Sequence, residues 1–254
     1  MTIAVFEEHV NTPKIGRATG RWRVVVEDPR ATVREENDIL IVFWNVAFGR
    51  EVLSKPADVL MEFIGRHGLI GGAEEFCKGY GGNYCFIACK GGKLVAYRSL
   101  TCSKPLYCSR GSEVICVASR RLPFLGVSKG FRRIGNSELL LPGLSSKHVH
   151  YRASKIGLYE ALRTAPLRLG LDRKVAVAFS GGLDSSITAK VLHDFGVDVK
   201  LFTTVFEGGI DDKMAVSAAE SLKLPLDVIR VNDREVEESL RDVIIAAETC
   251  NPIN

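Results

Sequence analysis

The sequence predicts two domains of different fold class: an α+β or mostly β domain over residues 1–147 and an α/β domain with a parallel sheet over residues 148–254. Three observations lead to this division. The first part consists of short strand-like runs separated by glycine-rich turns, whereas the second part alternates regularly between strand and helix. Between them, Pro142–Val149 gathers proline, glycine, serine and histidine, a composition typical of a linker.

The first domain is predicted to be built mainly from strands. The strand-like runs are Arg23–Glu27, Ile39–Ala47, Tyr84–Cys89, Leu94–Arg98 and Val114–Ala118. Ala57–His67 is the best helix candidate, because its apolar residues would share one face. Glycine pairs are expected to mark turns at Gly71-Gly72, Gly81-Gly82 and Gly91-Gly92, and the last of these is expected to close a hairpin.

The second domain is predicted from the alternation of two periodicities. Helices are expected at Ser154–Leu167, Ser186–Phe195, Asp212–Leu222 and Arg234–Ala247. Strands are expected at Lys174–Phe179, Val197–Phe206 and Leu226–Val231. The first of these strands is entirely apolar from Val175 onward, which is typical of a buried strand. Strands that alternate with helices of this length indicate βαβ units in a Rossmann-like parallel sheet.

The composition is that of a globular protein, with 46% hydrophobic residues, 25% charged residues and a net charge of +4. The arginines between Arg17 and Arg34 alternate with acidic residues, which predicts a solvated face and no nucleic-acid partner. With no signal-peptide pattern and no run long enough to span a bilayer, no membrane partner and a cytoplasmic location are expected. The seven cysteines lack zinc-site spacing and are expected to be buried thiols, while an intracellular disulfide stays open.

The clearest functional signal is the loop Ser180–Ser185, which follows the apolar strand and opens a helix. Ligands of parallel sheets bind beyond the carboxyl ends of the strands. Glycines at that place let backbone N–H groups approach phosphate oxygens, and the N-terminus of a helix favours anions. Ser180, Ser185 and Ser186 would add hydroxyl donors. Asp184 fits either a Mg²⁺ ion that bridges phosphates or the cap of the helix.

The structural alternative is a glycine-rich turn capped by Asp184 that binds nothing. The full string after a buried strand favours phosphate binding over that alternative. The loop is neither a Walker A sequence nor a G-x-G-x-x-G fingerprint.

The string SGGLDSS resembles the signature of the PP-loop ATP pyrophosphatases, which split ATP between its α and β phosphates. Other segments resemble the asparagine synthetase branch of that superfamily and follow its order along the chain. They are Arg98–Cys108, Val117–Leu125, Leu140–Gly143, Leu201–Ala215 and Ala247–Pro252. The resemblance implies an Ntn-hydrolase-like first domain with four αββα layers, followed by a PP-loop domain.

The resemblance also implies which residues form the site, with ATP and Mg²⁺ as its cofactors. The residues implied to hold pyrophosphate are Ser180, Gly181, Gly182, Asp184 and Ser185. Asp184 would contact the metal through pyrophosphate. The backbone near Phe179 and Thr204 would meet the adenosine.

The first domain departs from the active glutaminases that it resembles. Those domains begin Met-Cys-Gly-Ile and use the cysteine as nucleophile, whereas this chain has Thr2 at that position. The Arg-Asp pair of the family reads Arg98-Ser99 here, and its Asn-Gly-Glu string is not visible. We therefore expect an inactive glutaminase-like domain over residues 1–147, with Thr2 as an N-terminal nucleophile the alternative.

The second domain, residues 148–254, is expected to be incomplete at its C-terminus. The second acidic signature of the family, S-G-x-G-A-D-E, does not occur before Asn254. The local carboxylate candidates are Asp211, Asp212 and Glu248. We expect the chain to form a homo-oligomer or to need a partner chain that supplies the missing part.

The function expected from the resemblance is that of an ATP-dependent amidoligase. It would adenylate a carboxylate, with aspartate the best candidate, release pyrophosphate, and use ammonia in place of glutamine. The alternatives are a non-catalytic nucleotide-binding module or one subunit of a split synthetase. A PP-loop enzyme that acts on tRNA or another nucleotide is disfavoured, because the chain has neither a basic stripe nor a metal-type cysteine set.

Overall fold

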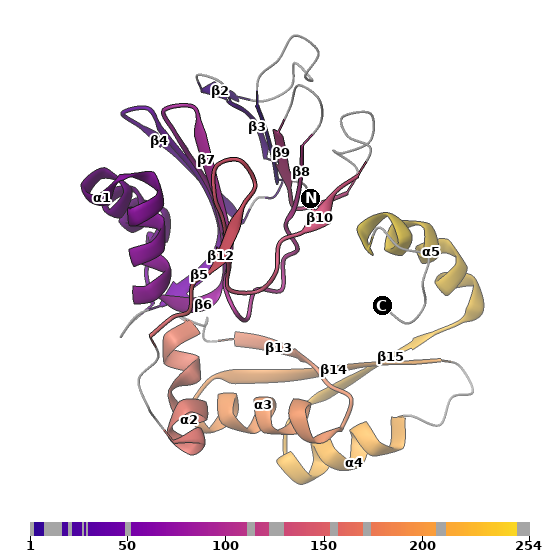
Figure 1. Cartoon of the computed structure of the whole chain (residues 1–254). Coiled ribbons are helices and arrows are strands. Elements are labelled where there is room, and N and C mark those ends of the chain that lie inside the picture. Colours follow the sequence, from indigo (N-terminus) through magenta and orange to yellow (C-terminus); the bar gives the residue numbers. More distant parts are fainter. Residues whose placement is uncertain are drawn as a thin grey trace. The chain divides into compact units, whose positions relative to one another are not determined.

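The structure is a computed structural model that describes residues 3–7, 17–19, 22–26, 28, 30–48, 52–110, 115–121, 130–152, 157–169, 174–206 and 212–247. The chain divides into two units, Met1–Ser154 and Lys155–Asn254 (Figure 1). Pro142–Val149 is not the linker that its composition predicts, because it forms the turn and second strand of a hairpin inside the first unit. Val149 is buried there, and its carbonyl accepts a hydrogen bond of 2.9 Å from the Tyr97 hydroxyl.

The described part of the first unit contains two six-stranded antiparallel sheets. The first sheet has the order β10-β8-β9-β1-β3-β2 and comprises β1 (Ile3–Glu7), β2 (Arg17–Thr19), β3 (Trp22–Val26), β8 (Tyr107–Arg110), β9 (Ile115–Ala118) and β10 (Arg132–Arg133). The second has the order β12-β11-β7-β6-β5-β4 and comprises β4 (Ala31–Glu36), β5 (Ile39–Phe48), β6 (Gly81–Lys90), β7 (Lys93–Arg98), β11 (Glu138–Leu140) and β12 (Ser146–His148). Helix α1 (Pro56–Gly79) packs on the second sheet.

The core of this unit has two layers, one on each face of the second sheet. Alternate residues of β5 divide between them: Leu40, Val42 and Trp44 pack toward the first sheet, and Ile39, Ile41 and Phe43 pack against α1. This explains why β5 is apolar from Ile39 to Trp44, since both of its faces are covered there. The described residues therefore provide one helical and two sheet layers of the expected αββα arrangement, and the second helical layer stays a prediction.

Glycine pairs were expected to mark turns, and only one of the three does. Gly91 and Gly92 have φ angles of 54° and 71° and join β6 to β7, which confirms the predicted hairpin. Gly71-Gly72 instead lies inside α1, which continues past a single non-helical residue, Gly68. A Cβ on Gly72 would stand 2.4 Å from the carbonyl oxygen of Phe63, so the glycine permits a close backbone approach.

Gly81-Gly82 is likewise not a turn, because it begins β6 opposite the end of β5. Gly82 has a φ of 125°, and an added Cβ would stand 2.4 Å from the carbonyl oxygen of Val46. A glycine pair can mark a turn, or it can lie within a strand where another backbone approaches closely. The sequence alone does not distinguish these two roles.

The second unit contains the predicted alternation of strands and helices (Figure 1). Its parallel strands are β13 (Lys174–Ala178), β14 (Asp198–Phe206) and β15 (Leu226–Val231), in that order across the sheet. Its helices are α2 (Leu158–Leu169), α3 (Leu183–Asp194), α4 (Asp212–Leu222) and α5 (Asp233–Ala247). The prediction of a parallel sheet in an α/β unit is therefore confirmed.

The core of the second unit lies on one face of this sheet, where Val177, Leu201 and Ala215 are buried among residues of α3 and α4. On the other face, Ala176, Ala178 and Thr204 are exposed. The all-apolar strand therefore is not buried on both sides, which corrects the prediction made from its composition. Ala176 and Ala178 are small apolar residues, which occur on exposed faces of a sheet as well as on buried ones.

The six described cysteines, Cys77, Cys85, Cys89, Cys102, Cys108 and Cys116, are free and buried, as predicted, and Cys250 lies outside the described residues. None of the helices in the described ranges is long and apolar enough to cross a membrane.

Candidate nucleotide-binding site

The predicted phosphate loop lies at the carboxyl end of β13, between that strand and α3. The N–H group of Phe179 donates a 2.7 Å hydrogen bond to the carbonyl of Phe202, which extends the pairing with β14 by one residue. The Phe179 side chain is buried in the core of the unit. It therefore anchors the strand end, and only its backbone is available for the predicted contact with adenosine.

The two glycines of the loop differ in their surroundings. Gly181 has a φ of 75°, and an added Cβ would lie 2.7–2.8 Å from backbone atoms of Met214 and Ala215 in α4. Gly182 has a φ of −72° and a ψ of 168°, which any residue adopts, and an added Cβ would meet only the Ser180 hydroxyl, at 3.3 Å. The fold therefore requires Gly181, whereas an added Cβ at Gly182 would meet a single side-chain atom and no backbone.

Backbone N–H groups and hydroxyls lie together at this loop. The N–H of Ser186 bonds to the carbonyl of Gly182, which closes the first turn of α3. The first N–H groups of a helix have no acceptor within that helix, and in α3 they belong to the residues that follow Gly182, its N-cap. Such N–H groups and the positive end of the helix dipole favour an anion.

The serine hydroxyls are held close to these N–H groups. The Oγ atoms of Ser180 and Ser185 lie 3.3 Å apart, and Ser185 Oγ donates to the carbonyl of Gly182 at 3.0 Å. Ser180 Oγ accepts a hydrogen bond of 3.3 Å from the N–H of Gly182. Ser180 is itself exposed, so its hydroxyl can be reached by an incoming phosphate.

Asp184 is not the cap of α3, which corrects one of its two interpretations. The helix begins at Leu183 with Gly182 as its N-cap, and no side chain caps it. Asp184 is the second residue of the helix, is exposed, and offers its carbonyl to the Thr188 hydroxyl at 2.8 Å. A carboxylate in the first turn is also stabilised by the positive end of the helix dipole. Its proposed contact with a metal stays a prediction.

Thr204 lies at the same edge of the sheet. Ala178 pairs with Phe202, so Thr204 on β14 is two residues beyond the last paired residue of β13, beside the start of the loop. Its side chain is exposed. Asp212 begins α4, whose first turn packs against Gly181. The other two carboxylate candidates, Asp211 and Glu248, lie outside the described residues, as does Thr2.

The arginine expected from the glutaminase resemblance serves the structure of the first unit. Arg98 is buried, and its three nitrogens donate to the carbonyls of Lys104, Cys102 and Ile134 at 2.8–2.9 Å. Ser99, in the position of the family's aspartate, donates its hydroxyl to Gly82 at 2.6 Å and accepts from the N–H of Tyr84. Both side chains are therefore engaged with backbone groups of the first unit.

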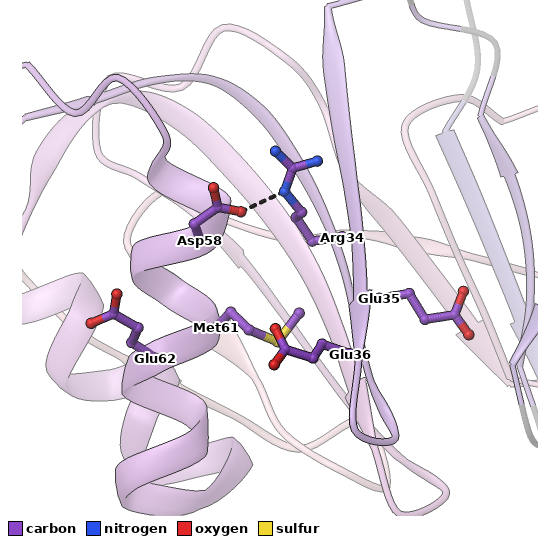
Figure 2. A pocket seen from close by; sticks show the side chains of 6 residues that line it. All are labelled: Arg34, Glu35, Glu36, Asp58, Met61 and Glu62. Carbon is purple, nitrogen blue, oxygen red and sulfur yellow. Dashed lines mark hydrogen bonds and ion pairs between the residues drawn. The ribbon is translucent and has the colours of Figure 1, made fainter.

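A cavity of about 180 Å³ lies between β4 and α1 in the first unit (Figure 2). Its lining is mostly acidic: Arg34, Glu35, Glu36, Asp58, Met61 and Glu62. Arg34 Nε pairs with Asp58 Oδ1 at 2.5 Å, and Glu35 extends from the opposite side of β4 (Figure 2). No local sequence signal marks this cavity, because it exists only where the strand and the helix meet.

Within the described ranges, no group of three His, Cys, Asp or Glu residues is placed to hold a metal ion. Asp211, which is one of the predicted carboxylates, lies outside those ranges. Mg²⁺ keeps several non-protein ligands when it binds nucleotides, so such a site needs few protein ligands.

Comparisons with known proteins cover the chain unevenly. A family described as "Family of unknown function (DUF7411)" matches residues 173–253, which include the loop, β14 and β15. No curated protein sequence matches the chain. A solved structure described as a predicted subunit of tRNA methyltransferase from Methanocaldococcus jannaschii is 34% identical over 31% of this chain, with a TM-score of 0.25.

Two larger enzymes match more of the chain at lower identity. Glutamine phosphoribosylpyrophosphate amidotransferase from B. subtilis, complexed with ADP and GMP, is 14% identical over 82% of the chain, with a TM-score of 0.37. An allosteric regulatory enzyme of purine biosynthesis is 12% identical over 89%, with a TM-score of 0.39. The chain spans 40%, 51% and 58% of the lengths of these three solved chains. TM-scores this low establish no shared activity, and none of the three is described as an asparagine synthetase.

Proposed function

We propose that the second unit binds ATP with its pyrophosphate end at the Ser180–Ser185 loop, and that the protein is an ATP-dependent amidoligase resembling asparagine synthetase. One observation carries the proposal. The loop at the carboxyl end of β13 leads into the first turn of α3, whose N–H groups have no partner within the helix, and the exposed Ser180 hydroxyl accepts a hydrogen bond from the N–H of Gly182, the N-cap of that helix. Such an arrangement would supply several donors to one anion.

The residues at the loop fit a magnesium–nucleotide complex. An added Cβ at Gly182 meets only one side-chain atom, so a phosphate can approach the backbone there. Asp184 offers an exposed carboxylate in the first turn of α3. When bound, Mg²⁺ would neutralise charge on the leaving pyrophosphate. Asp184 would contact the metal, while Ser180, Ser185 and the helix N–H groups would hold phosphate oxygens.

The proposed reaction transfers the adenylyl group of ATP to a carboxylate, and an amine then displaces AMP. Aspartate is the best candidate for the carboxylate and ammonia for the amine. The use of ammonia is supported by the first unit, where Arg98 and Ser99 bond to backbone groups. Catalysis would come from positioning and from stabilising the charge that develops on pyrophosphate.

Calorimetry with Mg²⁺ and ATP tests the site. Gly182→Val and Asp184→Ala should each weaken binding by about tenfold or more, equivalent to about 1.4 kcal/mol. Asp194→Ala is the matched control, because it removes an exposed aspartate from the opposite end of α3. Wild-type affinity in both loop variants would show that the nucleotide does not bind at the loop.

A non-catalytic nucleotide-binding module, or one subunit of a split synthetase, is the alternative function. One observation agrees with it: within the described ranges, no group of three His, Cys, Asp or Glu residues could hold a metal ion. Pyrophosphate release in the presence of ATP, aspartate and ammonia distinguishes the two. Binding of ATP with no release of pyrophosphate above background would support the alternative.

A further inference from the structure

Two histidines of the first unit lie next to each other at the end of one strand. His148 is the last residue of β12, and His150 follows two residues later in the chain. Their imidazole rings are stacked, with centroids 6.1 Å apart and an angle of 10° between the ring planes. We propose that His148 and His150 together chelate a transition-metal ion of the class that prefers imidazole ligands, such as Zn²⁺, Ni²⁺ or Cu²⁺.

The alternation of side chains along a strand places both rings on the same side. Successive side chains of a strand point to opposite faces, so residues two positions apart share a face. Val149, between the two histidines, is buried in the core that includes residues of α1, and Lys147 pairs with Glu74 of that helix. The two histidines therefore lie on the strand face opposite to α1, and both are exposed.

The backbone between the two histidines is fixed by two hydrogen bonds. The N–H of Val149 donates to the carbonyl of Ser137 at 2.8 Å, and the carbonyl of Val149 accepts from the Tyr97 hydroxyl at 2.9 Å. The folded unit thus holds the backbones of the two histidines at a set separation. An ion bound by the first imidazole is already close to the second, and ligands linked in this way bind more tightly together than either does alone.

The ring nitrogens of both histidines are accessible to an ion. Among the described residues, none forms a hydrogen bond or an ion pair with either ring, and each ring has the other as its aromatic contact. A zinc ion binds imidazole nitrogens at about 2.0–2.1 Å, so the rings must turn from the stacked arrangement until one nitrogen of each faces the ion. Exposed side chains change rotamer within nanoseconds, which makes this rotation easy.

The protein supplies two ligands to this site, and water supplies the others. Glu138 is directly opposite His148 in the pairing of β11 with β12, but both of its carboxylate oxygens are engaged. One of them pairs with Arg132 at 2.7 Å, and the other accepts a hydrogen bond from the N–H of Gly135. A site made of two imidazoles and water is open and exchanges its metal readily, unlike the closed four-ligand sites that hold structural zinc.

The ligand type selects the class of metal. Imidazole nitrogens suit Zn²⁺, Ni²⁺ and Cu²⁺, whereas Mg²⁺ and Ca²⁺ prefer oxygen ligands. Binding at the histidine pair is therefore independent of the Mg²⁺–nucleotide complex proposed for the second unit.

Calorimetric titration of the full chain with Zn²⁺, in the absence of nucleotide, tests the site. His148→Gln and His150→Gln should each weaken binding by at least about tenfold, because one of two linked ligands is lost. His67→Gln and His193→Gln are the matched controls, since each removes an exposed histidine from a helix. These two variants should bind Zn²⁺ as the wild type does.

Nuclear magnetic resonance of the imidazole nitrogens identifies the ligands directly. Addition of Zn²⁺ should shift the ring resonances of His148 and His150 and leave those of His67 and His193 in place. Because all of these side chains are exposed, the variants should keep the fold, and circular dichroism verifies this. Zn²⁺ binding of wild-type strength by the His148→Gln, His150→Gln double variant, or ring resonances of the pair that do not respond to Zn²⁺, would overturn the proposal.

Discussion

The backbone of Gly181 lies against the first turn of α4, where an added Cβ would stand 2.7 Å from the carbonyl oxygen of Met214. Its φ of 75° is also one that other residues rarely adopt. Its neighbour Gly182 has neither constraint. Of two identical adjacent residues, one is thus required by the packing of the unit and the other is available to a ligand.

Substitution of the two glycines should therefore separate stability from binding. Gly181→Ala should lower the free energy of unfolding by about 1–3 kcal/mol, from backbone strain alone, with the contact to α4 adding to that loss. Gly182→Ala should change it by no more than about 0.5 kcal/mol. Urea unfolding monitored by circular dichroism measures both. Equal losses in the two variants would contradict the distinction.

Binding of the pyrophosphate end and of the AMP end of the nucleotide should respond differently to a substitution in the loop. Inorganic pyrophosphate with Mg²⁺ should compete with ATP, and Ser180→Ala should weaken pyrophosphate more than AMP, because the exposed Ser180 hydroxyl lies with the helix N–H groups. A loss of about 0.5–1.5 kcal/mol is expected for one hydrogen bond. Competition calorimetry with each ligand measures it. An equal effect on AMP and pyrophosphate would indicate that the loop does not select phosphate groups.

The buried carboxylate of Asp28 should make the first unit sensitive to acid. It accepts hydrogen bonds from Lys104 at 2.5 Å, Trp44 at 2.8 Å and Arg30 at 3.1 Å. Burial would raise the pKa of Asp28, but the bonds from Lys104 and Arg30 outweigh it and hold the pKa well below its usual range. The charged form is thus stabilised in the folded state, and this contribution is lost as the pH falls below about 4.

Asp28→Asn should reduce stability by about 3–5 kcal/mol at pH 7, because it leaves the charge of Lys104 uncompensated. The difference from the wild type should shrink as the pH falls below about 4, because the unfolded chain then binds a proton at Asp28 while the folded chain does not. Urea unfolding across this range measures the change. A difference that stays constant with pH would show that the carboxylate charge is not what stabilises the unit.

We predict that the protein does not hydrolyse glutamine. The guanidinium of Arg98 is occupied by three backbone carbonyls and the hydroxyl of Ser99 by Gly82. Arg98→Lys should consequently destabilise the first unit, since the planar group that spans three carbonyls is lost. Incubation with glutamine and an assay for glutamate tests the absence of activity. Turnover that disappears in Thr2→Ala would instead identify Thr2 as a nucleophile.

Helix α5 should contribute to association of the chain. Leu240 and Val243 on this helix are 51% and 56% exposed, and Ile229 on the neighbouring strand is 48% exposed. Exposed apolar groups of this size favour contact with another surface. Sedimentation velocity at several concentrations should show association that decreases in the Leu240→Glu, Val243→Glu double variant. Arg241→Glu on the same helix is the control for added charge, and equal behaviour of the two would contradict the prediction.

Local patterns in the sequence were sufficient for much of the second unit. The limits of α4 and β15 agree with the predicted Asp212–Leu222 and Leu226–Val231, and the loop between β13 and α3 was located from its residues. The hairpin at Gly91-Gly92 was also predicted, because a glycine pair between two strands is typical of a hairpin turn, and both glycines do have positive φ angles. Such features depend on periodicity and turn chemistry within a few residues.

The sequence by itself therefore determined the order of the elements in the second unit, its parallel sheet and the position of the candidate loop. Only the tertiary structure decided that Gly71-Gly72 continues a helix, that Gly181 and Gly182 differ, and that Asp184 does not cap α3. It alone also brings Asp28 to Lys104, 76 residues away. The physical reason is that a residue's role depends on the atoms packed against it, and those atoms belong to segments distant in the chain, whose approach no local pattern records.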